Sequence, residues 1–311
     1  MVAWWQAYAF TNGVLNTDNT SIYGLSIDFG PFAFLDNFDP NYTPNHDDHM
    51  LRYSYKNQPS IIWWNLVRLG EALGELIGAG GRCDEREFVE EGVSKTWSEE
   101  LIKRAETLID RTGEEYKSVF LAEYKRLFGR RLGLKSHKES DFQELYSELL
   151  DTLEALELDF NHTFRKLSSI GMADISTEEQ RLDIAGRFFH HEGLGSTVAV
   201  KDESEARARL ARWLEKWRVR IIEDWKETPE ADASRAAEMK NANPKFVPRS
   251  WILDELIERV EKNGEREILD RIMAMALEPF KDEWGWNKEE EERFCGDVPR
   301  YQRAMQCSCS S

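Results

Sequence analysis

The sequence predicts a mainly α-helical fold with a short β-hairpin near its start, and three observations support this fold class. Beyond Pro59, apolar residues recur at spacings of three and four, as in Ile62, Leu66 and Leu69, which is the period of an amphipathic helix. Before that point, short apolar stretches within residues 14–27 are separated by Asn, Asp, Thr and Gly, a pattern that favours small strands. Hydrophobic residues make up 41% of the 311 residues, which is enough to bury a core.

The polar and apolar pattern also orders the elements along the chain. In chain order we expect a helix over 2–10, hairpin strands over 14–15, 22–23 and 25–27, a long loop over 36–59, and helices over about 60–78, 98–128, 140–169, 177–188, 202–226 and 250–280. Ser140 and Thr177 are expected to cap helices. The polar residues 227–243 are expected to form an exposed connection, whereas Trp213 and Trp217, four residues apart, are expected in the core.

Charge and hydropathy exclude several classes of partner. The chain has 41 Lys and Arg residues against 58 Asp and Glu residues, which gives a formal net charge of −17. This balance argues against a broad nucleic-acid footprint, because phosphate binding draws on clustered cations. No run of about 18 apolar residues occurs, so no membrane-spanning helix is expected. The first residues, Met1–Gln6, also lack the features of a secretory signal or a transit peptide.

The segment with the clearest chemistry places Asp18 and Asn19 in a turn, and Asp28 ahead of Phe29–Gly30. Phosphate-transferring enzymes need oxygen ligands for Mg²⁺ on two such elements. Against the kinase pattern His-Arg-Asp-x-x-x-x-Asn, Asn19 takes the metal-binding position and Val14 takes that of the catalytic Asp. Because valine cannot accept a proton, either Asp18 acts as the base or the loop is that of an inactive kinase.

Other interpretations of these polar residues stay open at this point. Asp, Asn and Thr are ordinary turn formers, and an Asp-Phe-Gly tripeptide often arises by chance. The segment His46–His49, with two imidazoles and two carboxylates, could hold zinc or could contact a substrate as part of the long loop.

Longer motifs carry a resemblance to a known family. They are Gly13–Asn19, Asp28–Phe32, Phe38–Pro40, Asn45–His46, Arg52–Pro59 followed by Trp64–Leu66, Asp159–Arg165, Asn243–Val247 with Arg249, and Cys309–Ser311. The sequence closely resembles the selenoprotein O family, also called YdiU, over essentially the whole chain. The resemblance implies a pseudokinase fold that transfers AMP, and not phosphate, from ATP to Ser, Thr or Tyr hydroxyls of proteins, with Mg²⁺ or Mn²⁺.

By position, the resemblance implies that Asp18 is the proton acceptor, that Asn19 is a metal ligand, and that Asp28 binds both metal and ATP. It also implies a kinase-like carboxyl-terminal lobe with a helical extension. Residues 1–83 would form the catalytic and metal-binding part of that lobe, residues 84–280 its helical remainder and extension, and residues 281–311 a tail. The eukaryotic members of the family are mitochondrial, so a mitochondrial location is expected by resemblance alone.

Three departures from the family pattern leave rival functions open. The chain begins in the helix ahead of the catalytic loop, so the amino-terminal lobe with its glycine-rich loop is expected to be absent. Asn12 stands where a His is common, and Pro44 stands where some members have a Cys. A truncated, inactive lobe that serves at most as an interaction module is therefore one alternative, and a conventional phosphate-transferring kinase relative is another.

The four cysteines are too few for a disulfide scaffold in a chain of this length. Cys83 and Cys295 are isolated, whereas Cys307 and Cys309 form a Cys-Ser-Cys pair. Cys309 occupies the place where some animal relatives carry selenocysteine. Cys307 could form a disulfide with it or resolve its oxidised form, and two ordinary thiols in a flexible tail are the alternative.

Overall fold

The chain was analysed as a computed structural model that describes residues 1–27, 30–93, 95–189, 203–298 and 300–307. The helices and strands are α1 (Val2–Tyr8), β1 (Phe10–Thr11), β2 (Ala33–Phe34), α2 (Gln58–Ala72), α3 (Gly74–Ala79), α4 (Arg86–Glu91), α5 (Ser98–Arg131), α6 (Glu139–Asp141), α7 (Glu148–Ala155), α8 (Phe160–Leu167), α9 (Glu178–Gly186), α10 (Glu203–Asp224), α11 (Pro229–Ala242), α12 (Ser250–Asn263), α13 (Glu267–Leu277) and α14 (Lys288–Phe294). Single turns of 3-10 or π helix lie at Tyr55–Asn57, Gly80–Asp84, Phe142–Ser147, Ala173–Ile175 and Arg300–Gln302. The predicted fold class, mainly α with a short antiparallel hairpin, is confirmed.

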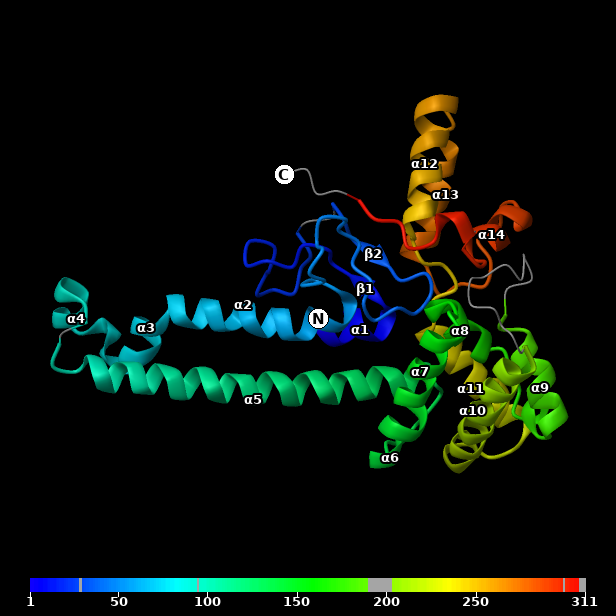
Figure 1. Cartoon of the computed structure of the whole chain (residues 1–311), viewed down its shortest axis with the longest axis horizontal. Coiled ribbons are helices and arrows are strands. Elements are labelled where there is room, and N and C mark those ends of the chain that lie inside the picture. Colours follow the sequence, from blue (N-terminus) through cyan, green and yellow to red (C-terminus); the bar gives the residue numbers. More distant parts are fainter. Residues whose placement is uncertain (28–29, 94, 190–202, 299, 308–311) are drawn as a thin grey trace.

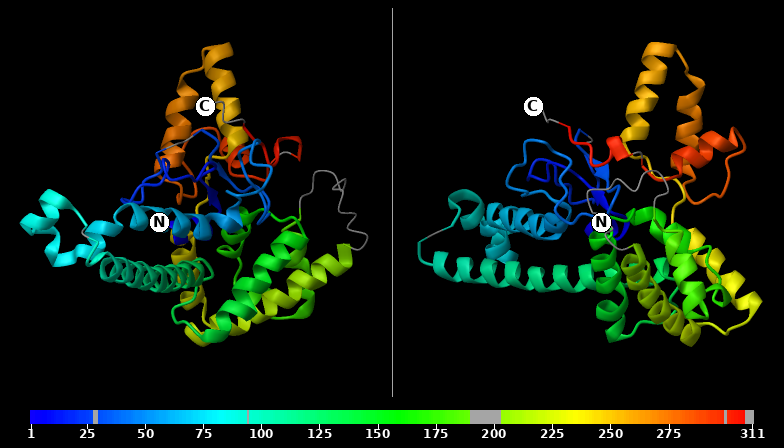
Figure 2. Two further views of the ribbon diagram at one scale, coloured as in Figure 1. Left: turned by 60° about the vertical axis from the view of Figure 1, so that its left-hand side comes forward. Right: turned by 45° about the vertical axis from the view of Figure 1, so that its right-hand side comes forward.

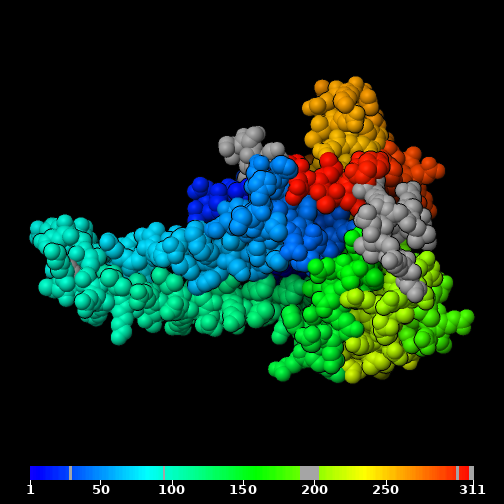
Figure 3. All heavy atoms as spheres, in the orientation of Figure 1, coloured from blue at the N-terminus to red at the C-terminus, as the bar shows by residue number. Residues whose placement is uncertain are grey.

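The helices form a block from which two pairs of helices project in different directions (Figures 1 and 2). The long helix α5 runs beside α2 and α3 and makes an arm, whose cyan tip stands clear of the remaining chain in the space-filling view (Figure 3). Close packing within the arm depends on small residues. A Cβ added to Gly113 of α5 would lie 2.7 Å from the ring of Trp63 in α2, a distance that side chains do not tolerate.

The main core lies where α5, α7, α8, α9 and α10 meet. Trp213 and Trp217 of α10 are fully buried in it, as predicted, and each indole N–H donates to a backbone carbonyl, of Leu145 and Leu132 respectively. Such donation removes the cost of burying the polar end of tryptophan. A second cluster of buried residues joins α12, α13 and α14 and contains Phe246, Trp251, Ile252, Ile268, Ile272, Met275, Phe294 and Val298.

One arginine fastens the start of the chain to this block. Arg131, at the end of α5, is fully buried and donates to the carbonyl of Ala7 in α1, to Asn161 Oδ1 at 3.1 Å and to Asn243 Oδ1 at 2.8 Å. Its guanidinium also lies 3.8 Å from the ring centroid of Phe164. Burial lowers the pKa of Arg131 to about 10, so the side chain remains charged at neutral pH.

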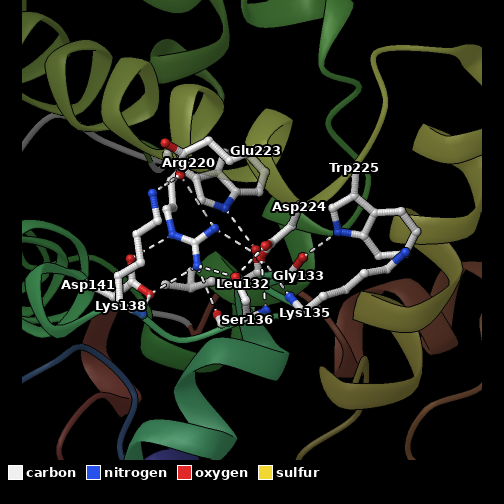
Figure 4. A network of polar contacts seen from close by, with 11 residues as sticks. Leu132, Gly133, Lys135, Ser136, Lys138, Asp141, Arg220, Glu223, Asp224 and Trp225 are labelled. Atoms are coloured by element: carbon white, nitrogen blue, oxygen red, sulfur yellow. Dashed lines mark hydrogen bonds and ion pairs between the residues drawn. The ribbon is translucent and has the colours of Figure 1, made fainter.

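A second polar network ties α10 to the segment between α5 and α6 (Figure 4). Arg220 of α10 donates to Asp141 Oδ1 at 2.7 Å and lies 3.0 Å from Asp224 Oδ2. Asp224 in turn accepts hydrogen bonds from the backbone N–H groups of Lys135 and Ser136. Both carboxylates are almost fully buried, so their charges depend on Arg220.

The structure corrects two expectations about which residues form strands and helices. The paired strands are Phe10–Thr11 and Ala33–Phe34, and not the apolar stretches within residues 14–27. Two-residue strands are fixed by their partner and carry no periodic signal of their own. Residues 227–243 are not an exposed connection, because α11 forms there with the side chain of Thr228 as its N-cap and with Met239 fully buried.

Three helices expected from the pattern are interrupted, and the first, over about 60–78, divides at Leu73 between α2 and α3. The expected helix over 140–169 breaks around residues 156–159 between α7 and α8, and Ser140 lies inside α6 and does not cap it. The expected helix over 250–280 breaks at Gly264, whose positive φ of 68° ends α12 in a left-handed conformation. Thr177 does cap α9, as predicted, because its side chain accepts from Gln180 N–H. Within the described residues, no helix has the length and apolar character needed to cross a membrane.

Candidate functional site

The candidate site is the loop that joins β1 to β2, which carries two of the predicted residues in its described part. The strands pair antiparallel, with Phe10 opposite Phe34 and Thr11 opposite Ala33. A side-chain hydrogen bond from Thr11 Oγ1 to the carbonyl of Ala33 adds to this pairing. The strand pairing therefore holds the two ends of the loop next to each other.

Two amide side chains of α2 hold the loop through hydrogen bonds. Asn65 Nδ2 donates to the carbonyls of Leu15 and Asn16 at 3.1 and 3.2 Å and to Thr20 Oγ1 at 2.7 Å. Gln58, seven residues earlier, accepts from the N–H of Asn12 at 2.9 Å. Seven residues are two helical turns, so both amides lie on the same face of α2, and both are buried.

Sequence reasoning did not single out Gln58 or Asn65, although both fall in segments that carry the family resemblance. The signal that could have found them is their spacing. Two amides seven residues apart on an otherwise apolar helix face need partners once that face is buried. The partners are backbone groups of a loop that lies 46 to 50 residues away in the sequence, and no local pattern identifies them.

The predicted residues Asp18 and Asn19 lie together in the loop. Asp18 is exposed and Asn19 is half-buried. The N–H of Asn19 donates to Asn16 Oδ1 at 2.9 Å, and its Nδ2 donates to the carbonyl of Val14 at 2.8 Å. The nitrogen end of this amide thus faces Val14, so its oxygen end is directed away from that carbonyl. Asp28, the third predicted residue, lies outside the described residues.

Asn12 supports the loop through contacts on both sides of it. Its Nδ2 donates to Ser26 Oγ at 2.7 Å, which connects the start of the loop to the segment just ahead of Asp28. Gly13 has a φ of +99°, and a Cβ there would lie 2.7 Å from Pro31 Cγ. Asn12 therefore ties the two halves of the loop directly together.

Part of this loop itself presents an apolar surface. Ile22, Tyr23, Leu25 and Ile27 are all more than half exposed, and Trp4 of α1 is 44% exposed. Several large apolar residues exposed so close together in the sequence are unusual on a protein surface that contacts only water. They indicate a binding face.

The structure does not assemble a metal site at His46–His49. Asp48 uses its carboxylate to accept from the backbone N–H groups of Arg52 and Tyr53 at 2.9 and 2.8 Å, which makes it a turn-forming residue. The rings of His46 and His49 lie 6.0 Å apart, centroid to centroid. The segment therefore holds the long loop together and offers no convergent set of ligands.

Among the described residues, the group whose ligand atoms do converge is Asp159, His162 and Asp297, all within 4.8 Å of one another. Asp159 is also paired with Arg249, whose Nη2 donates to Asp159 Oδ1 at 2.9 Å and whose Nη1 lies 2.7 Å from Oδ2. A guanidinium already compensates this carboxylate, and it would repel a bound cation. The group is therefore better described as a partly buried ion-pair network.

The carboxyl-terminal segment lies on the long loop that follows β2. Cys307 N–H donates to the carbonyl of Pro44 at 2.9 Å, and His46 N–H donates to the carbonyl of Cys307 at 3.0 Å. Asp36 accepts from Ala304 N–H, and burial raises the pKa of its carboxyl, although Arg249 opposes this shift. Cys307 is an exposed free thiol. Cys309 lies outside the described residues, so the pairing of these two cysteines stays a prediction.

Comparison with known proteins gives consistent matches. A family model described as "Protein adenylyltransferase SelO" matches residues 1–277. The chain is similar to "Protein adenylyltransferase SelO, mitochondrial" of Schizosaccharomyces pombe, with 40% identity over 315 residues that cover 100% of this chain and 52% of the relative. The protein of the same name from Saccharomyces cerevisiae is 34% identical, with 100% of this chain and 53% of the relative covered.

A bacterial relative, "Protein nucleotidyltransferase YdiU" of Paraburkholderia xenovorans, is 33% identical over 307 residues, which cover 99% of this chain and 51% of the relative. The chain thus spans about half the length of the curated relatives it matches.

Proposed function

The chain belongs to the SelO family of protein adenylyltransferases, and on this premise we propose that it forms the catalytic and metal-binding part of an enzyme that transfers AMP from ATP to proteins. The acceptor groups are Ser, Thr or Tyr hydroxyls. The observation that carries the proposal is the turn with Asp18 and Asn19, which the hairpin and the amides of α2 hold in one place. Rate enhancement in such transfers comes mainly from positioning and electrostatics.

In the proposed reaction, the hydroxyl oxygen of the acceptor attacks the α-phosphorus of ATP. The bond from that phosphorus to the bridging oxygen breaks, pyrophosphate leaves, and the hydroxyl proton passes to Asp18. The exposure of Asp18 supports this role, because a carboxylate at the surface of the loop is accessible to a side chain of another protein.

We propose Asn19 and Asp28 as ligands of Mg²⁺ or Mn²⁺, with Asp28 also contacting ATP. The donor set fits, because amide and carboxylate oxygens are what these hard cations prefer. For Asn19, the hydrogen bond from Nδ2 to Val14 commits the nitrogen and fixes the orientation of the amide. A bound divalent cation would neutralise phosphate charge.

The remaining parts of the proposal concern the whole protein. Residues 1–83 belong to a kinase-like carboxyl-terminal lobe, residues 84–280 to its remainder and extension, and residues 281–311 to a tail. The other half of the relatives' length would supply the rest of the ATP site. The two yeast relatives are named mitochondrial, which supports a mitochondrial location here, and the net charge of −17 supports protein rather than nucleic-acid substrates.

Labelled ATP tests the transfer. The chain, alone and joined to the amino-terminal half of its S. pombe relative, is incubated with Mg²⁺, a protein mixture and ATP labelled at either the α or the γ phosphate. We expect incorporation of the α label only, and a loss of roughly 10²- to 10⁴-fold in Asp18→Asn and complete loss in Asp28→Ala. Asp47→Asn, an exposed loop carboxylate, is the matched control and should retain activity. Incorporation of the γ label would instead support a conventional kinase.

A second candidate is an inert lobe that binds no nucleotide and offers only an interaction surface. The exposed apolar residues Ile22, Tyr23 and Leu25 favour it, because they could serve a partner protein as well as a nucleotide-binding lobe. Equilibrium titration of the chain with ATP and Mg²⁺ separates the two candidates, since tight binding by the 311-residue chain would exclude the inert lobe.

A further inference from the structure

A cavity of about 370 Å³ lies outside the candidate site, since none of its described lining residues belongs to the loop between β1 and β2. It is formed where α8 and the end of α9 meet the segment after α11 and the end of α14, elements that lie close together in Figure 1. Its volume falls within the range of roughly 300 to 1,000 Å³ that is typical of small-molecule sites.

The charge of this cavity is opposite to that of the whole chain. Its lining carries four cationic side chains and two carboxylates: Arg165, Lys166, Arg187, Lys245, Asp174 and Asp282. Four minus two gives a local charge of +2, in a chain whose formal charge is −17. Such a local reversal favours an anionic ligand, because the surrounding walls focus the field of the cations into the cavity.

The two lysines are only weakly compensated. Lys166 Nζ lies 3.9 Å from Asp297 Oδ1, at the limit of an ion pair. Lys245 Nζ donates to the backbone carbonyl of Asp282 and forms no ion pair with any carboxylate of the described residues. The carboxylate of Asp282 is instead engaged by Arg165 at 2.5 Å and by Lys240 at 3.1 Å. Binding an anion would therefore cost each lysine few of its existing interactions.

The rest of the wall is rigid and partly apolar. Arg165 is more than nine-tenths buried, and its Nη1 donates to the carbonyls of Lys240 and Asn243, so this guanidinium is fixed in place. Ile170, Ile184 and Phe188 contribute buried apolar surface to the lining. A ligand that fills the cavity thus contacts both cationic side chains and hydrocarbon.

We propose that this cavity binds a small phosphate monoester, with the phosphate near Lys166 and Lys245 and an apolar body against Ile170, Ile184 and Phe188. A bare phosphate ion would leave much of the volume and the apolar surface unused. This site is separate from the proposed nucleotide-transfer site and does not depend on it.

Calorimetric titration of the 311-residue chain with phenyl phosphate tests the proposal, since this probe joins a phosphate to an apolar ring. We expect saturable binding that is tighter than binding of inorganic phosphate. In the double variant Lys166→Gln and Lys245→Gln, binding should weaken by roughly tenfold or more, because charge-assisted hydrogen bonds are lost. Lys262→Gln, an exposed lysine of α12, is the control and should bind as the parent chain does.

Thiol labelling locates the ligand. Cys295 lines the cavity and Cys83 does not, so phenyl phosphate should slow alkylation of Cys295 and leave that of Cys83 unchanged. Phenol, which lacks the anion, should give no protection. The same binding is expected in Asp18→Asn, so a failure of AMP transfer would leave this result intact.

Three results would overturn the proposal. They are the absence of saturable binding, equal binding by the double variant and the Lys262→Gln control, and equal protection of Cys295 by phenol. O-phosphoserine distinguishes the source of the phosphate, because tighter binding of this probe than of phenyl phosphate would assign the cavity to a phosphorylated side chain and contradict the small-molecule assignment.

Discussion

Asn65→Ala provides the sharpest test of how the candidate site is held. The side chain contacts three acceptors, but an amide nitrogen carries only two hydrogens, so the three contacts correspond to about two full hydrogen bonds. At roughly 0.5 to 1.5 kcal/mol each, and with a buried carbonyl of Leu15 left without its donor, the loss in unfolding free energy should be about 2 kcal/mol. Amide exchange in residues 15–20 should accelerate by up to roughly 30-fold.

Urea denaturation and hydrogen exchange measure these two effects. The matched control is Asn57→Ala, which removes the same kind of side chain but only one exposed hydrogen bond, to the carbonyl of Leu51 at 2.8 Å, and should cost below about 1 kcal/mol. If Asn65→Ala and Asn57→Ala had the same unfolding free energy, and if exchange in residues 15–20 stayed at its parent rate, α2 would not be what holds the loop.

Three further predictions concern the helical block and its thiols. Arg220→Met should lower the unfolding free energy by about 3 to 5 kcal/mol, because two buried carboxylates lose their cation, whereas the exposed Arg111→Met should cost below about 1 kcal/mol; urea unfolding compares them. Burial alone would raise the pKa of Asp224, but hydrogen bonds from its neighbours and the charge of Arg220 outweigh burial and hold it below the usual 3.8. The stability from Asp224 is therefore fully present above that pH and lost as the pH falls through the folded-state pKa, so Asp224→Asn should flatten the acid limb of a pH–stability curve. Burial raises the pKa of Cys295 to about 12, so mass spectrometry should find it alkylated far more slowly than Cys83 at pH 8, and equal rates would contradict this.

The strongly periodic parts of the fold could be predicted from the sequence. The apolar face of α10, with Trp213 and Trp217, shows a helical period that survives folding because both indoles enter the core. The short pattern of α11 was missed, although Thr228 and Pro229 are a cap followed by a favoured first residue. Its exposed positions are so polar that the buried residues Arg235, Met239 and Ala242 do not reveal an apolar face.

The candidate site was predictable only in part, for a reason of distance along the chain. Asp18 and Asn19 could be proposed as site residues because their spacing from Asp28 is local. The supporting contacts of Gln58 and Asn65 join segments that are about 50 residues apart, and a single sequence gives no record of such pairing. For Asp18, Asn19 and Asp28 alike, the role remains a prediction that the labelling experiment tests.

The buried guanidinium of Arg131 has a consequence for synthesis on the ribosome. Its acceptors belong to residues 7, 161 and 243, so this set of contacts cannot be complete until the last of these residues has left the exit tunnel. Asn243 is 112 positions beyond Arg131, which at bacterial or eukaryotic elongation rates is a delay on the order of ten seconds. Throughout that interval the Arg131 guanidinium lacks one of its three acceptors, and a chaperone can bind the unfinished contact region around it.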